Sequence, residues 1–226
     1  MSFIMDEKMT SEGIKIISFD LDGTLVKPEY SEWVWGVGIP HLFAQKRGIS
    51  FDEAKVVVEE EYHKVGDGSL EWYDISYWFN LFQLDGSWRS LLNRYSHKIK
   101  TYPEVSKVLR DFSSHYMVIM ISNAAREFID IEVEVAELRG FFSRIFSATS
   151  DFGEIKKTTQ FYDRICQLLQ IKPREMVHVG DHWEFDYVVP KGLGIRAFHV
   201  DRSWSRGGND VIRSLEEVRL RLGVRG

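Results

Sequence analysis

The sequence predicts an α/β protein in which a Rossmann-like core with a parallel sheet carries an inserted α-helical cap. Three observations predict this fold. From about residue 102, apolar strand-like runs alternate with helical patterns, which implies right-handed crossovers and a sheet covered on both faces. One further strand-like run, residues 14–19, precedes that region, and the stretch between them shows helical patterns without a convincing buried strand. We therefore expect a core of residues 1–28 and 102–226 and a cap of residues 29–101.

The individual elements follow from local signals along the chain. Ser50-Phe51-Asp52-Glu53 has the form of a capping box, which predicts a helix that runs toward Lys64. Pro190 removes a backbone hydrogen bond where a helix should follow Asp186, so we expect that helix to start late or to kink. Further helices are expected at residues 70–84, 87–95, 103–112, 125–138 and 159–169, with a last helix capped by Asn209, and further strands at residues 117–121, 144–148, 176–179 and 196–200.

Composition narrows the class of protein. The 226 residues are 44% hydrophobic and 28% charged, which is typical of a soluble globular chain. A net charge of −5 offers no footprint for nucleic acid, and the scattered Lys and Arg residues argue against a membrane-surface role. Cys166 is the single cysteine, so no internal disulfide forms. Residues 1–13 lack the apolar core of a signal peptide and no run approaches transmembrane length, so a cytoplasmic protein is expected.

Acidic residues stand at the carboxyl ends of two predicted strands. Asp20 and Asp22 follow the first strand, and Asp181 and Asp186 follow the strand at residues 176–179. In an open α/β sheet, ligands bind in the crevice beyond these strand ends. Carboxylates that converge there repel one another unless a cation lies between them, and Mg²⁺ prefers such hard oxygen ligands. Asp20 and Asp22 are therefore either helix caps or part of a chemical site, and magnesium fits a site where the acids of both strands converge.

Two other groups of polar residues lie in comparable places. Ser122 and Asn123 end the strand at residues 117–121, where a helix-capping role is the sounder interpretation when they are taken alone. No G-x-S-x-G pattern surrounds Ser122, which argues against a serine hydrolase. Lys156 and Lys157 form a pair of the kind that is usually solvated, and we expect that for one of the two.

The motifs together resemble those of the haloacid dehalogenase (HAD) superfamily. Asp20-Leu21-Asp22-Gly23-Thr24 resembles its first motif, D-x-D-G-T, and Ile121-Ser122-Asn123 resembles the second. Gly153-Glu154-Ile155-Lys156-Lys157, with Phe161 downstream, resembles the third, G-x-x-K-P…F; the spacing points to Lys156, although Lys157 replaces the proline. Gly180-Asp181 with Asp186 resembles the fourth, G-D-x-x-x-D. The four motifs occur in order over essentially the whole chain.

The resemblance implies a phosphatase that hydrolyses a small phosphorylated metabolite and depends on Mg²⁺. Asp20 would be the nucleophile that forms an aspartyl-phosphate, and Asp22 would protonate the leaving oxygen and later activate water. Lys156, Ser122 and Asn123 would contact the phosphoryl oxygens.

The same resemblance implies a ligand set for the metal. Asp20, the main-chain carbonyl of Asp22, and Asp181 would hold the ion, and Asp186 would support them from behind. Zinc is set aside, because His178 and His182 do not share a helix face.

Several alternatives stay open at this point. A phosphomutase uses the same residues and differs in excluding water, whereas a 2-haloacid dehalogenase lacks the second acid of the first motif, so Asp22 argues against it. A non-catalytic interaction protein on this fold is improbable with the acids intact. Phosphoglycolate, a triose phosphate and a sugar phosphate are not ranked as substrates, and the chain could be a monomer or a homodimer. The roles of His182, Glu184, Trp33 and Trp35 are also open.

Overall fold

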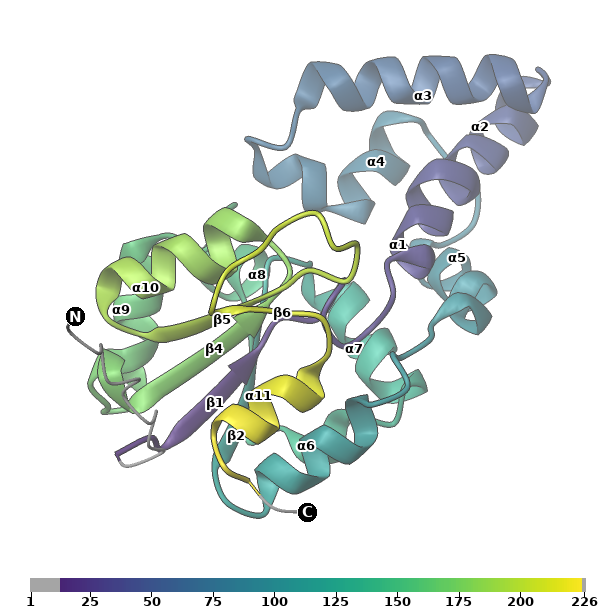
Figure 1. The fold of residues 1–226 in the computed structure, drawn as a ribbon. Coiled ribbons are helices and arrows are strands. Elements are labelled where there is room, and N and C mark those ends of the chain that lie inside the picture. Colours follow the sequence, from purple (N-terminus) through teal and green to yellow (C-terminus); the bar gives the residue numbers. More distant parts are fainter. Residues whose placement is uncertain (1–12, 225–226) are drawn as a thin grey trace.

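The computed structural model describes residues 13–224, and its centre is a six-stranded parallel sheet (Figure 1). The strand order is β3-β2-β1-β4-β5-β6, and every neighbouring pair runs parallel. The strands are β1 (Ile16–Phe19), β2 (Met117–Ser122), β3 (Arg144–Ser147), β4 (Met176–Gly180), β5 (Arg196–Val200) and β6 (Val211–Ile212). The predicted α/β fold class is confirmed, and β1, the first motif's strand, lies in the middle of the sheet beside β4.

Helices cover both faces of this sheet because successive strand residues point to opposite sides. On β1, Ile17 and Phe19 pack into one hydrophobic cluster, where Phe19 meets Phe112 of α6 at 5.8 Å between ring centroids, and Ile16 packs into the other. Both sides of this central strand are thus buried, as expected of a strand in the middle of a parallel sheet. The covering helices are α6 (Val105–Ser113), α7 (Arg126–Val135), α8 (Ala148–Phe152), α9 (Thr159–Leu168), α10 (Val189–Leu193) and α11 (Leu215–Arg221).

The segment between β1 and β2 is helical and lies beyond the carboxyl ends of the strands (Figure 1). Its helices are α1 (Glu29–Trp33), α2 (Ile39–Arg47), α3 (Phe51–Val65), α4 (Ile75–Leu81) and α5 (Trp88–Tyr95), with a π-helical turn at Val34–Gly38 and 3₁₀ turns at Leu70–Tyr73 and Ser96–Lys98. Trp78 and Phe82 lie in its interior, as their helical spacing indicates.

The chain enters and leaves this helical segment through two connections that run side by side. Lys27 N donates to the carbonyl of Lys100 at 2.8 Å, and Tyr102 N donates to the carbonyl of Leu25 at 3.2 Å. Two adjacent antiparallel connections are a common way to join an inserted domain to a core. These two lie next to the boundaries expected from the sequence. We therefore propose residues 29–101 as a separate cap domain.

Most local predictions are confirmed, and two are wrong. The capping box is present, since Ser50 Oγ accepts from Glu53 N and the Glu53 carboxylate accepts from Ser50 N. The single helix expected at residues 70–84 is divided, because the Asp74 carboxylate accepts from Ser76 N and starts α4 anew. Asn209 caps no helix: β6 intervenes, and Ser214 caps the shorter α11.

The interruption expected at Pro190 is confirmed. A π-helical turn spans Trp183–Val188 and continues directly into α10, so Pro190, which has no N–H to donate, lies where the helix changes from one form to the other. Within residues 13–224, every helix falls short of the length and apolar character that a membrane crossing requires.

Candidate active site

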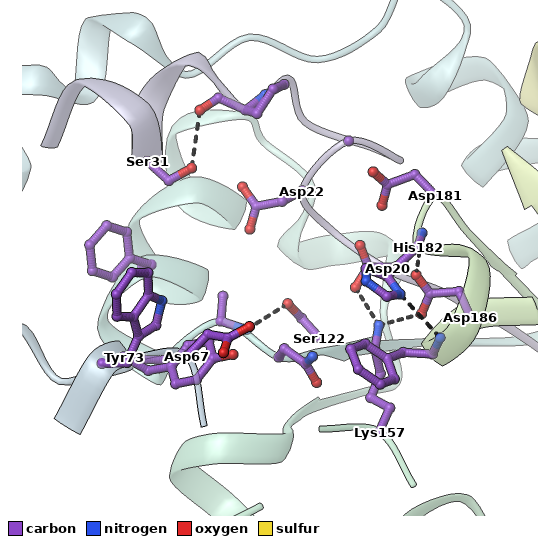
Figure 2. A pocket seen from close by; sticks show the side chains of 18 of the residues that line it. Asp20, Asp22, Ser31, Asp67, Tyr73, Ser122, Lys157, Asp181, His182 and Asp186 are labelled. Carbon is purple, nitrogen blue, oxygen red and sulfur yellow. Dashed lines mark hydrogen bonds and ion pairs between the residues drawn. The ribbon is translucent and has the colours of Figure 1, made fainter. Parts of the chain in front are cut away.

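The acids of the first and fourth motifs meet because their strands are neighbours. Phe19 and Val179 are partners in the parallel ladder between β1 and β4, and Asp20 N donates to the Val179 carbonyl at 2.9 Å. Asp20 and Asp181 therefore leave the sheet side by side, and Asp186 faces them from the turn that follows (Figure 2). Each of these three carboxylates offers one oxygen that lies within 4.8 Å of the others.

The lysine at this site is Lys157, and the choice of Lys156 from motif spacing is corrected. Lys157 Nζ lies 2.6 Å from Asp20 Oδ1 and 2.5 Å from Asp186 Oδ1, and its side chain is only 2% exposed. Lys156 instead places its ammonium 5.6 Å from the centre of the Phe185 ring. Gly153 ends α8 and Thr158 caps α9, so residues 154–157 form a loop in which no helical periodicity indicates the inward residue.

Asp186 is fixed from three sides. Its Oδ1 forms an ion pair with Lys157 Nζ and lies 3.0 Å from His178 Nε2. Its Oδ2 accepts a hydrogen bond from His182 N at 2.9 Å. His178 Nδ1 in turn lies 2.7 Å from Ser18 Oγ in the interior of the sheet. Although burial opposes it, the Lys157 cation holds the pKa of Asp186 below its ordinary value. These contacts agree with the expected supporting role of Asp186, which stays a prediction.

Two glycines allow the acids to approach this closely. A Cβ atom at Gly180 would lie 2.3 Å from Asp186 Cγ, and one at Gly23 would lie 2.2 Å from Asp181 Oδ2. Gly23 also has a φ of +73°, a conformation that side chains other than glycine rarely adopt. The motif glycines are therefore required by contact with the acids, in addition to turn geometry.

The donor set fits a hard divalent cation. Burial, together with the charges of Asp186 and Asp181, raises the pKa of Asp20 to about 8 against the lowering effect of Lys157. One ammonium group thus leaves the three carboxylates incompletely compensated, and carboxylate oxygens are ligands that Mg²⁺ prefers. The side chain of Asp22 lies outside this cluster, so its expected contribution through the main-chain carbonyl stays a prediction.

Asp22 has the properties of a group that carries a proton near neutral pH. Burial, followed by the neighbouring Asp20, raises the pKa of Asp22 to about 7. Its Oδ1 is buried and has no hydrogen-bond partner among the described residues. A carboxyl group with such a pKa can serve both as acid and as base.

Ser122 and Asn123 end β2 and line the same cavity, as expected from the second motif. Ser122 Oγ accepts from Ala124 N at 3.0 Å, which leaves the hydroxyl proton free to be donated. Asn123 Oδ1 is buried without a partner in the described part of the chain. The Ser122 hydroxyl can donate to an oxyanion, and Asn123 would do so through its Nδ2 group; both roles stay predictions.

The cavity has a volume of about 570 Å³ and extends from the acids to the cap. Of the residues whose roles were open, Trp35 and His182 line it, whereas Trp33 and Glu184 do not. Trp33 instead lies beneath Lys98, with 3.8 Å between the ammonium and the ring centroid. Four further lining residues come from residues 29–101 and were not predicted from the sequence: Ser31, Asp67, Trp72 and Tyr73. Asp67 lies between Gly66 and Gly68, which indicate a turn but give no sign that the side chain lines a cavity.

Comparison with known proteins places this geometry in a family. The model of the haloacid dehalogenase-like hydrolases matches residues 14–194. The chain therefore belongs to the haloacid dehalogenase-like hydrolase family, and the resemblance found in the motifs is confirmed.

Individual relatives agree with that assignment. A HAD phosphatase from Thermococcus onnurineus is 28% identical, with a TM-score of 0.81, and the match covers 93% of this chain and 99% of that one. The GMP/IMP nucleotidase YrfG of Escherichia coli K12 is 22% identical over 172 residues, which are 75% of each chain. The HAD-hydrolase YfnB of Bacillus subtilis, in a form bound to magnesium, is 14% identical with a TM-score of 0.64 over 93% of this chain and 99% of that one, which shows the fold alone. The phosphatase and nucleotidase relatives bear out the expected class, a HAD-type phosphoric monoester hydrolase.

Replacing Lys157 should destabilise the protein far more than replacing Lys156. Lys157→Met leaves two buried carboxylates without their cation, which should lower the free energy of unfolding by about 3–5 kcal/mol. Lys156→Met is the matched control and should cost less than about 1 kcal/mol. Chemical denaturation of both variants at neutral pH measures the difference, and equal losses would contradict the assignment of Lys157.

Without divalent cations, stability should fall as the pH rises from about 4 to about 8. The pKa values of Asp20 and Asp22 are raised from 3.8 to about 8 and about 7, so in this range the folded state retains protons that the unfolded state has released. Their stabilising contribution is complete below pH 3.8 and is lost as the pH passes the raised values. Denaturation in EDTA across this range measures the slope. Asp22→Asn should make it shallower, and a flat profile in the unaltered protein would contradict the prediction.

Proposed function

We propose that the protein hydrolyses phosphate monoesters in a Mg²⁺-dependent reaction that passes through an aspartyl-phosphate on Asp20. The observation that carries the proposal is the pairing at one strand end of a lysine-bound carboxylate, Asp20, with Asp22, whose pKa of about 7 suits proton transfer. The placement of Asp181 and Ser122 at the neighbouring strand ends supports it.

The chain's own residues account for the two chemical steps. An Asp20 oxygen attacks phosphorus, the bond from phosphorus to the leaving oxygen breaks, and Asp22 donates its proton to that oxygen. Asp22 then accepts a proton from the water that attacks the aspartyl-phosphate, which releases inorganic phosphate and restores both carboxyl groups.

The remaining groups act on charge and position. Lys157 and Ser122 donate hydrogen bonds toward the phosphoryl oxygens as negative charge develops there. Asp20, the main-chain carbonyl of Asp22, and Asp181 would hold Mg²⁺, which supplies positive charge to the same oxygens. Asp186 keeps Lys157 and the His182 backbone in place.

The substrate candidates come from two sources. The family resemblance implies a small phosphorylated metabolite such as phosphoglycolate, a triose phosphate or a sugar phosphate. The similarity to the nucleotidase YrfG adds the purine nucleoside monophosphates.

A cytoplasmic location and a monomeric or homodimeric state remain predictions from sequence.

Replacing the nucleophile should abolish turnover without unfolding the protein. Asp20→Asn keeps the shape of the side chain but removes the anionic oxygen, so the rate of phosphate release should fall by at least about 10³-fold. Phosphate release from p-nitrophenyl phosphate measures the rate, and thermal unfolding controls for the fold. A folded variant with near-normal turnover would refute the assignment of Asp20.

Removing divalent cations should silence the enzyme reversibly. Treatment with EDTA should stop phosphate release, because the carboxylates then repel the substrate phosphate, and added Mg²⁺ should restore the rate. Calcium is the informative comparison, since its larger size and looser geometry should support less turnover. Activity that persists unchanged in EDTA would contradict the metal proposal.

A further inference from the structure

The cavity that holds the acids contains few positive charges. Among the described residues, Lys157 is the only lysine or arginine that lines it, and its ammonium already lies against Asp20 and Asp186. Asp22, Asp67 and Asp181 add further carboxylates to the lining. A substrate with a second anionic group beside its phosphate therefore finds no side-chain cation to pair with and meets carboxylates instead.

Aromatic side chains form much of the remaining wall. Trp35 and Phe128 both line the cavity and stack on each other, with 5.2 Å between ring centroids and an interplanar angle of 19°, so the ring of Phe128 supports the ring of Trp35 from one side. Trp72 and Tyr73 line the cavity from the 3₁₀ turn that precedes α4. Such surfaces bind planar rings by stacking, without a requirement for one particular ring.

One carboxylate in this wall has no partner. Asp67 lies in the turn after α3, is exposed to solvent, and makes no hydrogen bond or ion pair among the described residues. Asp67 is close enough to Tyr73 to affect its titration: burial raises the pKa of the Tyr73 phenol, and the Asp67 charge adds to that effect. Figure 2 shows Asp67 and Tyr73 on the opposite side of the cavity from Lys157 and Asp186. Asp67 is thus placed to meet the end of a substrate that is remote from its phosphate.

We propose that the cavity selects phosphate monoesters whose alcohol carries an uncharged, flat heteroaromatic ring with N–H donors, as in a purine nucleoside monophosphate. The ring contacts Trp35, Trp72 or Tyr73, and its N–H groups donate to the Asp67 carboxylate. The inference rests on the proposed function and ranks its substrates, because it places phosphoglycolate, whose carboxylate is a second anionic group beside the phosphate, last. A volume of about 570 Å³ is within the range of about 300–1,000 Å³ that is usual for small-molecule sites.

The first experiment compares esters that differ only in the ring. Inosine 5′-monophosphate and ribose 5-phosphate share the phosphate and the sugar, and phosphoglycolate is the anionic comparison. With Mg²⁺ present, kcat/KM for inosine 5′-monophosphate should exceed that for ribose 5-phosphate by at least about tenfold, and phosphoglycolate should be the poorest of the three.

The second experiment tests Asp67 and Tyr73, each with a variant and a matched control. Asp67→Asn should lower the ratio of kcat/KM for inosine 5′-monophosphate to that for ribose 5-phosphate by about tenfold, mainly through KM. Glu60→Gln removes an exposed charge from α3 outside the cavity and should leave the ratio unchanged. Tyr73→Leu should lower the ratio, whereas Tyr73→Phe, which keeps the ring, should not.

The outcomes separate this inference from the function on which it rests. If ribose 5-phosphate or phosphoglycolate is hydrolysed as well as inosine 5′-monophosphate, the inference is overturned and the phosphatase proposal stands. The same holds if Asp67→Asn leaves the ratio within about twofold. If no phosphate is released from any of these esters or from p-nitrophenyl phosphate with Mg²⁺, the proposed function fails and the inference fails with it.

Discussion

The site depends on one buried ammonium group that lies between two carboxylates. Lys157 Nζ contacts both Asp20 and Asp186 at 2.5–2.6 Å, and all three side chains are nearly excluded from water. Burial alone would drive each acid toward its neutral form, but the lysine favours the ionised forms. Because a buried ion pair with one partner removed costs several kcal/mol, the geometry of Asp20, the proposed nucleophile, and the stability of the core are linked at this point.

Contacts in the interior of the sheet also hold Asp186, the second partner of Lys157, in place. Ser18, His178 and Asp186 form a chain of contacts that begins within β1 and β4 and ends at Lys157. The same two strands bring Asp20 beside Asp181, so one pair of neighbouring strands sets both the position and the charge of the site. Glycine is required at residues 23 and 180 because a larger side chain at either would occupy the space of an acid.

The parts of the fold and of the candidate site that could be predicted are those that a local sequence pattern indicates. Acids after buried strands reveal the site, because parallel strands bring their carboxyl ends to one edge. Lys157 could not be told from Lys156, because both lie in a loop where no period indicates the inward side. Asp67 and Tyr73 reach the cavity only through the placement of the cap over the core, which local patterns do not encode. Likewise β6, with two residues, is too short for a pattern to reveal.

The charge of the cavity assigns different tasks to its two walls. A phosphate monoester is itself anionic, yet the cavity presents five aspartates, at residues 20, 22, 67, 181 and 186, and a single lysine. The phosphate can therefore be accepted only where positive charge is concentrated, near Lys157 and the acid cluster that fits a divalent ion. The cap contributes rings and one unpaired carboxylate, which favour an uncharged, flat group with N–H donors. In the proposed reaction the core determines the reacting group, and residues 29–101 determine which alcohol carries it.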